Sequence, residues 1–389
     1  MIPRLKKLPK KSFILLGPRG VGKSTLIKQQ IKPALEINLL RSKDYISLGQ
    51  NPDRLLEMTT ALKEGDWVFI DEVQRVPEIL NVVHDIYESR RIHFALSGSS
   101  ARKIKRGGGN LLAGRALQAF LYPFVYPEFY KNQSIEDAII WGTLPVVVTQ
   151  DEYRKDTLAT YVETYLREEL IQEGIIRKID SFLRFLQIAG LLNGQILNYE
   201  NVSREAHLGR TTIQTYFDVL IETLIGFHLP SYQPAMKVKE ISKPKFYFFD
   251  SGVARACADL LSYDVDPSYK GYLFETLIIN QIRAYNDYSG KKLGLYYYGV
   301  SSGFEVDLII ETKKRSPSKK AEIIPIEIKM GRQFKREWLQ GIKSIRAQDK
   351  ITIGPSYCVY LGNEKAVVNG VNVLSAEDFL KKLFKGESF

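Results

Sequence analysis

The stretch FILLGPRGVGKST, residues 13–25, decides the fold of the first part of this chain. Its four leading apolar residues are typical of a buried strand, a glycine-rich turn follows, and a helix is expected from about Lys23. Residues 17–24, GPRGVGKS, satisfy the full P-loop pattern, in which backbone N–H groups and a helix N-terminus surround phosphates. The sequence therefore predicts a nucleotide site between a strand and a helix.

The residues of this loop have separate expected roles. Lys23 is expected to reach the β- and γ-phosphates, and the hydroxyl of Ser24 is expected to hold Mg²⁺. The expected cofactors are therefore ATP and Mg²⁺. The predicted ATP-binding residues run through the loop into the helix: Gly17, Gly20, Val21, Gly22, Lys23, Ser24 and Thr25.

A second motif, WVFIDEVQ at residues 67–74, ends an apolar strand in two carboxylates. The carboxyl ends of parallel strands share one sheet edge, so we expect Asp71 and Glu72 beside the loop. Asp71 is expected to orient Mg²⁺, directly or through water, and Glu72 to activate the attacking water as general base. Both residues belong to the predicted catalytic centre.

Two further segments carry polar candidates for this site. In LSGSS, Ser97 or Ser99 either contacts the γ-phosphate or the attacking water, or simply ends a strand. In RKIKRGGGNLLAGRA, Arg115 either stabilises transition-state charge, in its own chain or in a neighbouring subunit, or pairs with a local carboxylate. The sequence leaves both choices open.

Length and periodicity divide the 389 residues into three expected domains. Residues 1–145 alternate strands and helices, which predicts an α/β domain with a parallel sheet. Residues 146–235 are mainly helical, and NVSREAHLGRTTIQTYFDVL predicts a helix-turn-helix, possibly winged, whose second helix either contacts DNA or packs against protein. Residues 236–389 are mixed, with helices and strands.

These segments together resemble a family of prokaryotic AAA+-type ATPases whose C-terminal domain is similar to PD-(D/E)xK nucleases. The matching segments occur in the family's order: GPRGVGKST, FIDEVQRVPEI, LSGSSARKI, LAGRA with YPFVYPEF, WGTLPVVV, the helix-turn-helix and KPKFYFFDSGVA. The resemblance implies an AAA+-like sheet with strand order five-one-four-three-two, a winged-helix middle domain and a restriction-endonuclease-like C-terminal domain. Ser24 stands where the family often has Thr.

The C-terminal part holds a second constellation of charged residues. Asp307 lies on one expected strand, and Glu327 and Lys329 lie on one face of the next because side chains alternate along a strand. If the two strands are neighbours, the carboxylates of Asp307 and Glu327 could hold Mg²⁺, with Glu275 from a helix completing the shell, while Lys329 activates water or stabilises the phosphate. The resemblance implies a nuclease layout here and leaves cleavage itself open.

Composition indicates which class of partner the chain favours. Lys and Arg outnumber Asp and Glu by 55 to 44, and the net charge of +11 favours contact with a polyanion, DNA first. The sequence has no apolar run near the ~20 residues of a membrane span and no secretory signal pattern. Its two cysteines are too few for a disulfide framework, so a reducing cytoplasm is expected. Oligomeric state stays open.

Two hypotheses follow. In the first, ATP binding and hydrolysis control a DNA-directed, Mg²⁺-dependent nuclease domain. In the second, the chain is an ATP-dependent switch or scaffold that binds a protein partner or DNA, and its C-terminal carboxylates are structural.

Overall fold

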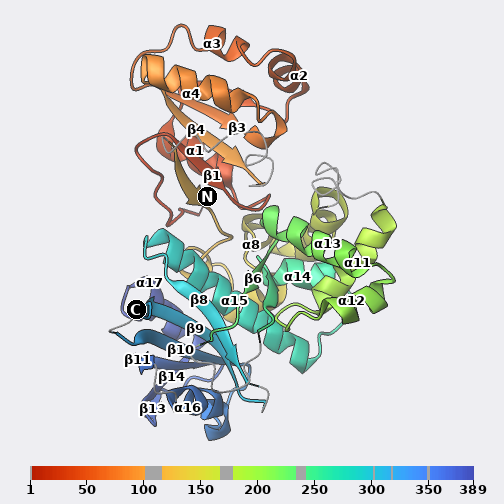
Figure 1. Cartoon of the computed structure of the whole chain (residues 1–389), viewed down its shortest axis with the longest axis vertical. Coiled ribbons are helices and arrows are strands. Elements are labelled where there is room, and N and C mark those ends of the chain that lie inside the picture. Colours follow the sequence, from red (N-terminus) through yellow and green to blue (C-terminus); the bar gives the residue numbers. More distant parts are fainter. Residues whose placement is uncertain are drawn as a thin grey trace.

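Three parts of the chain follow one another from top to bottom in Figure 1. An α/β domain (red to orange) lies above a helical part (yellow to green), and a second sheet (blue) lies below both. The computed structural model describes residues 2–100, 116–166, 178–233, 242–300, 303–316, 319–347 and 351–389.

The N-terminal sheet has five parallel strands in the order β2-β3-β4-β1-β5. This confirms the expected order five-one-four-three-two. The strands are β1 (Phe13–Leu16), β2 (Leu35–Asn38), β3 (Trp67–Asp71), β4 (His93–Gly98) and β5 (Leu117–Phe120). The helical segments are α1 (Lys23–Ile31), α2 (Ser42–Gln50), α3 (Arg54–Met58), η1 (Val73–Arg75) and α4 (Ile79–Arg90).

Strand β1 is buried on both faces, as a central strand of a parallel sheet should be. Phe13 and Leu15 belong to the core shared with the rest of the chain, whereas Ile14 and Leu16 belong to the core beneath α4. Because neighbouring strands are parallel, the P-loop after β1, the carboxylates at the end of β3 and the serines at the end of β4 all lie at one edge of the sheet.

The middle part is helical and ends in a small sheet. Its helical segments are α6 (Tyr126–Phe129), α7 (Ile135–Trp141), α8 (Pro145–Thr149), η3 (Asp151–Tyr153), α9 (Arg154–Thr160), the π-helical turn η4 (Tyr161–Leu166), α11 (Ile179–Leu191), α12 (Tyr199–Ala206), α13 (Arg210–Glu222) and α14 (Ser251–Cys257). The expected helix-turn-helix is present as α12 and α13, joined through His207 in the left-handed region. Antiparallel β6 (Gly226–Leu229) and β7 (Lys245–Phe248) follow, while the winged-helix assignment stays a prediction.

The C-terminal part is a mixed sheet whose main path is β13-β14-β12-β10-β9-β8, with β11 also paired to β10. Its strands are β8 (Gly294–Gly299), β9 (Glu305–Lys313), β10 (Ala321–Lys329), β11 (Ile351–Ile353), β12 (Ser356–Tyr360), β13 (Ala366–Val368) and β14 (Val371–Ser375). Its helical segments are α15 (Pro267–Tyr288), η5 (Arg336–Leu339), α16 (Gln340–Arg346) and α17 (Ala376–Phe384). Strands β9 and β10 are antiparallel neighbours, so the adjacency that the Asp307 hypothesis needs is present.

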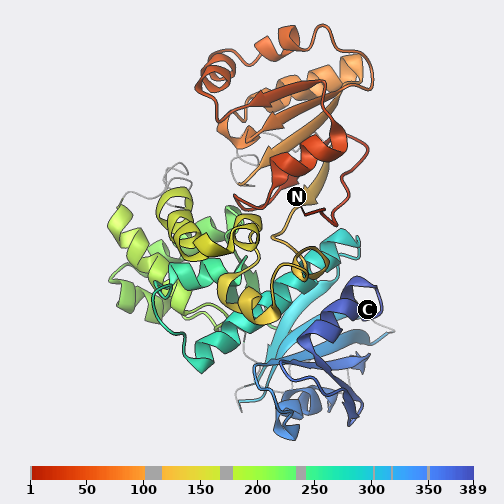
Figure 2. The ribbon, with the colours of Figure 1, turned by 180° about the vertical axis from the view of Figure 1, so that it is seen from behind.

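Helix α15 carries Glu275, which was expected on a helix. It begins at Pro267, where the Asp266 side chain accepts hydrogen bonds from Ser268 N and Tyr269 N, and it continues for 22 residues. In Figures 1 and 2 this helix (teal to cyan) runs between the helical part and the C-terminal sheet, and its cyan end lies beneath the N-terminal domain. None of the helices in the described ranges combines the length and apolar character that a membrane crossing requires.

Candidate functional site

The P-loop between β1 and α1 has the backbone geometry that its glycines allow. Gly20 and Gly22 have φ of 83° and 90°, in the left-handed region that side chains rarely adopt. Gly17 packs so closely on the segment after β5 that an added Cβ would lie 2.4 Å from Leu121 O. The loop is therefore preformed, with its shape set by contacts on both sides.

Lys23 is buried at the start of α1, and its ammonium group turns back over the loop. Nζ donates to Gly17 O at 2.8 Å and to Pro18 O at 3.1 Å. These carbonyl contacts hold the Lys23 ammonium group over the loop whose backbone is expected to surround the phosphates.

Ser24 and Asp71 meet across the edge of the sheet. Ser24 Oγ lies 2.9 Å from Asp71 Oδ1 and 2.8 Å from Oδ2, and Ser97 Oγ donates to Asp71 Oδ1. Hydroxyl and carboxylate oxygens are the hard ligands that Mg²⁺ prefers, so the donor set fits the predicted cation. Ser97 also accepts a hydrogen bond from Glu72 N at 3.2 Å, so this serine orients the acidic pair.

Glu72 stands in the left-handed region at φ 58°, which is uncommon for a residue with a side chain and typical of functional sites. Gln74 Nε2 donates to Glu72 Oε2 and, at 2.9 Å, to Ser99 Oγ, and Ser99 Oγ lies 3.3 Å from the same glutamate oxygen. Gln74 and Ser99 thus fix the side chain expected to act as general base. Gln74 was missed from sequence, although it lies within the quoted motif.

Two residues far from the motifs contact the P-loop. Tyr161, in η4, donates its hydroxyl to Arg19 O at 3.0 Å, so the helical part lies against the loop. Arg4 donates to Val21 O at 2.6 Å and to Tyr122 O at 2.6 Å, and it forms a buried ion pair with Glu128 at 3.1 Å. No local pattern signals either contact, because each depends on the tertiary fold.

The C-terminal constellation is also brought together. Lys329 Nζ lies 3.0 Å from Asp307 Oδ2 and 3.2 Å from Glu327 Oε2, and Ile328 N donates to Asp307 Oδ2 at 2.7 Å. Both carboxyl groups are buried, whereas the lysine side chain is about a third exposed at 31%. The structure therefore brings the three predicted residues together, and Lys329 is the most exposed of them.

Burial and mutual repulsion set the charge state of the two carboxyl groups. Burial, and then the Asp307 charge, raise the pKa of Glu327 well above its usual range. Burial opposes ionisation of Asp307 too, but Lys329 and Lys245 hold the pKa of Asp307 below its usual value. The Lys329 ammonium, 3.2 Å from Glu327 Oε2, partly offsets this rise. Two carboxyl groups that contact one lysine supply the oxygen donors that suit a Mg²⁺ ion that keeps several waters.

Glu275 reaches this region from α15 but has partners of its own. Lys245 Nζ lies 3.0 Å from Glu275 Oε1, Tyr247 donates its hydroxyl to the same oxygen, and Lys245 also pairs with Glu305. Burial raises the pKa of Glu275 to about 7, against the effect of Lys245. Its role in a metal shell stays a prediction. In the part of the chain that the structure describes, no three His, Cys, Asp or Glu side chains form a metal-binding group.

Arg115 lies outside the described residues, so its predicted role stays a prediction.

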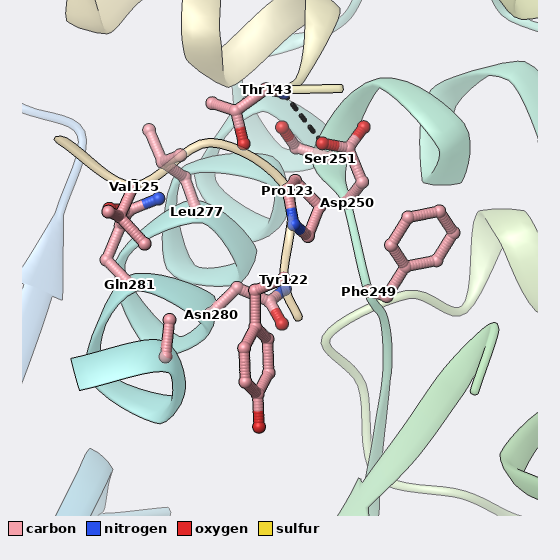
Figure 3. Close-up of a pocket in the computed structure, with 11 residues that line it drawn as sticks. Tyr122, Pro123, Val125, Thr143, Phe249, Asp250, Ser251, Leu277, Asn280 and Gln281 are labelled. Atoms are coloured by element: carbon pink, nitrogen blue, oxygen red, sulfur yellow. Dashed lines mark hydrogen bonds between the residues drawn. The ribbon is translucent and has the colours of Figure 1, made fainter. Parts of the chain in front are cut away.

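A small cavity beside α15 lies where the segment after α7 packs against the start of α14 (Figure 3). Its free volume is about 10 Å³, room for roughly one water. Buried Asp250 caps α14 by accepting from Val253 N at 3.1 Å and also accepts from Thr143 N at 2.7 Å. This carboxylate ties the segment after α7 to α14, and the cavity is too small for a substrate.

The N-terminal part of the chain is similar to a known family. Residues 9–130 match a family described as an AAA domain. The N-terminal domain is an AAA domain. The parallel sheet, the P-loop after β1 and the carboxylates at the end of β3 agree with that assignment, so this part of the chain is a P-loop domain of the AAA+ ATPase type. Residues 132–264 and 270–379 match two domains of unknown function, DUF8612 and DUF4143, so the matches assign no activity beyond the AAA domain.

Two relatives share parts of the sequence. An uncharacterized protein of Haemophilus influenzae is 22% identical over 272 residues, which are 62% of this chain and 68% of the relative. The Holliday junction branch migration complex subunit RuvB of Mycoplasma genitalium is 30% identical over 105 residues, 26% of this chain and 32% of that protein. The second match thus spans about a third of its relative.

Solved structures give weaker likenesses. A single-residue variant of RuvB of Thermotoga maritima has a TM-score of 0.32 at 14% identity and covers 57% of this chain and 82% of that one. The Aeropyrum pernix ORC1 protein in complex with DNA has a TM-score of 0.27 at 10% identity, covering 66% and 87%. Both scores lie below 0.5, so the AAA assignment rests on the family match and the site geometry.

Proposed function

We propose that the AAA domain binds and hydrolyses MgATP and that its nucleotide state controls a DNA-directed, Mg²⁺-dependent phosphodiesterase site at Asp307, Glu327 and Lys329. The observation that carries the proposal is the meeting of these side chains on two adjacent strands, where the carboxyl groups of Asp307 and Glu327 both lie within 3.2 Å of the Lys329 ammonium group. Mg²⁺, when bound there, supplies Lewis-acid stabilisation of the phosphate oxygens.

The chemistry at the P-loop follows from the contacts around it. Lys23 leaves the loop carbonyls to bind the β- and γ-phosphates, and Ser24 with Asp71 holds the cation. Glu72, fixed by Gln74, accepts a proton from the water that attacks the γ-phosphorus. The bond from that phosphorus to the bridging oxygen breaks, and ADP leaves with inorganic phosphate.

The chemistry at the C-terminal site uses the same logic. Asp307 and Glu327 supply oxygen ligands, and the Lys329 ammonium is placed to stabilise charge on the phosphate as water adds and a P–O bond of the backbone breaks. Glu275 stays a predicted further ligand of the Mg²⁺ ion, and its Oε1 oxygen, bound by Lys245 and Tyr247 in the structure, would have to leave them to take part.

DNA is the polymer that charge and likeness favour. The net charge of +11 favours a polyanion, and the chain shares 30% identity over 105 residues with a protein named for Holliday junctions. The N-terminal residues of α13 supply further donors, although Arg210 pairs with Glu200 at 2.7 Å.

The test is cleavage of linear, circular and single-stranded DNA by purified protein with Mg²⁺ or Mn²⁺, with and without ATP. Cutting that Lys329→Ala abolishes is the expected result. Intact DNA under every condition overturns the nuclease part, and cutting that survives in Lys329→Ala belongs to a contaminant.

One observation favours the switch hypothesis instead. Lys329 contacts both Asp307 and Glu327, and Lys245 contacts Glu275, so each carboxyl group of the cluster already has a cationic partner, as in a structural core. A slope of log affinity for DNA against log salt near zero would favour this second function, whereas several phosphate contacts give a steep slope.

A further inference from the structure

A cavity of about 240 Å³ lies between the P-loop and helix α15. The P-loop side is formed by Gly17 and Pro18, and the opposite side includes Phe227 of β6 and Arg283 of α15. Residues from distant parts of the sequence therefore line one space beside the loop that is expected to hold the triphosphate.

Arg283 is a cation in the wall of this cavity that lies against an aromatic ring. Its Cζ lies 3.4 Å from the centroid of the Phe227 ring, and its guanidinium donates to Asn280 Oδ1 at 3.0 Å. Burial lowers the pKa of this guanidinium, because Tyr122 and Asp287 offset only part of the lost hydration. Asp287, one turn further along the helix, is bound by Lys6 at 3.0 Å. Among the described residues no carboxylate is ion-paired with Arg283, which leaves its remaining donors available to an anion in the cavity.

From Arg283 a series of contacts leads to Glu275 and Lys245 beside the C-terminal site, where the Lys245 charge helps to hold the pKa of Asp307 down. Phe227 stacks on Tyr247 with ring centroids 5.5 Å apart and planes 18° apart. Tyr247 donates its hydroxyl to Glu275, and Lys245 binds Glu275 and Glu305. Phe227 and Tyr247 are also directly paired between β6 and β7, so the small sheet holds them in register.

Helix α15 provides a second, covalent link between the same two places. Near its C-terminal end, Tyr288 accepts a hydrogen bond from Tyr122 N at 3.1 Å and Asp287 binds Lys6, which ties the helix to the AAA domain. Glu275 lies on the same helix. Figures 1 and 2 show this helix passing from beneath the AAA domain along the C-terminal sheet.

We infer that Arg283 binds the terminal phosphate of the nucleotide on the P-loop, and that α15 and the Phe227–Tyr247 stack pass this state to the Asp307, Glu327 and Lys329 site. The inference rests on the proposed function and names its regulation. With ATP bound, the guanidinium turns from Phe227 towards the phosphate, and Tyr247 and Glu275 shift with their neighbours. With ADP, Arg283 returns to the aromatic ring.

The nucleotide half is tested by calorimetric titration of the full chain with Mg-ATPγS and with Mg-ADP. Because a charge-assisted contact to the last phosphate is lost, Arg283→Ala should weaken ATPγS binding by about 10- to 100-fold, and ADP binding by less than about twofold. Arg283→Lys should keep part of the preference for ATPγS, and the exposed control Arg184→Ala should keep all of it. Equal weakening of both nucleotides, or no change, overturns the role of Arg283.

The relay half is tested by hydrogen exchange of peptides covering residues 243–250 and 321–330, with saturating ATPγS or ADP. The wild type should show different protection in the two states, and Tyr247→Phe or Phe227→Leu should remove the difference while both nucleotides still bind. Equal protection in the two wild-type states, or an unchanged difference in both variants, overturns the relay. This readout needs no DNA cleavage, so an inactive C-terminal site and a missing relay give different results.

Discussion

Ser24 Oγ lies within 2.9 Å of both carboxylate oxygens of Asp71. The two residues are 47 positions apart and belong to the first turn of α1 and the end of β3. Their contact lies where a divalent cation is expected against the β- and γ-phosphates. Mg²⁺ would be held by the Ser24 hydroxyl and, directly or through water, by Asp71, so the pair is a direct target for experiment.

Asp71→Asn should remove most of the Mg²⁺ dependence of ATP binding. We expect an affinity loss of roughly 10- to 100-fold with Mg²⁺ present and a much smaller loss in EDTA, because the amide is a poorer cation ligand. Fluorescence titration with a labelled ATP analogue measures both values. The control is Asp85→Asn on α4, whose side chain is 77% exposed. An equal loss with and without Mg²⁺ would remove Asp71 from the cation site.

Glu72→Gln should bind ATP normally and hydrolyse it slowly. The amide oxygen keeps the contact with Gln74 but cannot accept a proton from water, so turnover should fall by about 10²- to 10⁴-fold. Phosphate release under saturating ATP measures turnover, and Lys23→Ala, which should lose binding itself, marks the background. Turnover equal to that of the wild type would exclude Glu72 as the base.

Local pattern was sufficient for much of the fold. The run 13–16 becomes β1, the run ending at Asp71 becomes β3, and the strand expected to carry Glu327 and Lys329 is β10. Each strand is buried on both faces or alternates between two cores, and such strands leave clear apolar patterns in sequence. The helix from Ser42 to Gln50 was missed, because a single buried residue, Leu48, gives it no apolar stripe.

Only part of each candidate site could be predicted from the sequence. Ser24 with Asp71, and Asp307 with Lys329, could be predicted to meet because strand ends in one sheet share an edge or a face. The partners that hold these residues could not. Arg4 on Val21 O, Tyr161 on Arg19 O and Lys245 on Glu275 join segments whose proximity depends on packing of whole domains. A buried ion pair such as the last leaves no periodic signal.

Gly142→Ala should be strongly destabilising. Gly142 has φ of 74°, and an added Cβ would lie 1.9 Å from Asp250 Oδ1, so backbone strain and overpacking act together. We expect a loss of roughly 2–6 kcal/mol in the free energy of unfolding. The matched control is Gly65→Ala, with φ of 86° and no atom of the described residues within 4 Å of the new Cβ, which should cost about 1–2 kcal/mol. Calorimetric melting compares them; equal shifts in Tm would show that Asp250 is not tightly held.

Asp250 should make the folded state more stable in mild acid than at neutral pH. Burial raises the pKa of this carboxyl to about 6, so between its unfolded value of 3.8 and about 6 the folded chain binds a proton that the unfolded chain does not. Stability from this group is therefore present below 3.8 and lost as pH rises through about 6, by roughly 3 kcal/mol. Asp250→Asn lacks the titration, so wild-type stability minus variant stability should fall from about pH 4 to about pH 7. The difference for Asn198→Ala, which removes the cap of α12, should stay constant. A difference for Asp250→Asn that grows with pH would show that the backbone N–H donors outweigh burial and that the carboxylate is held ionised.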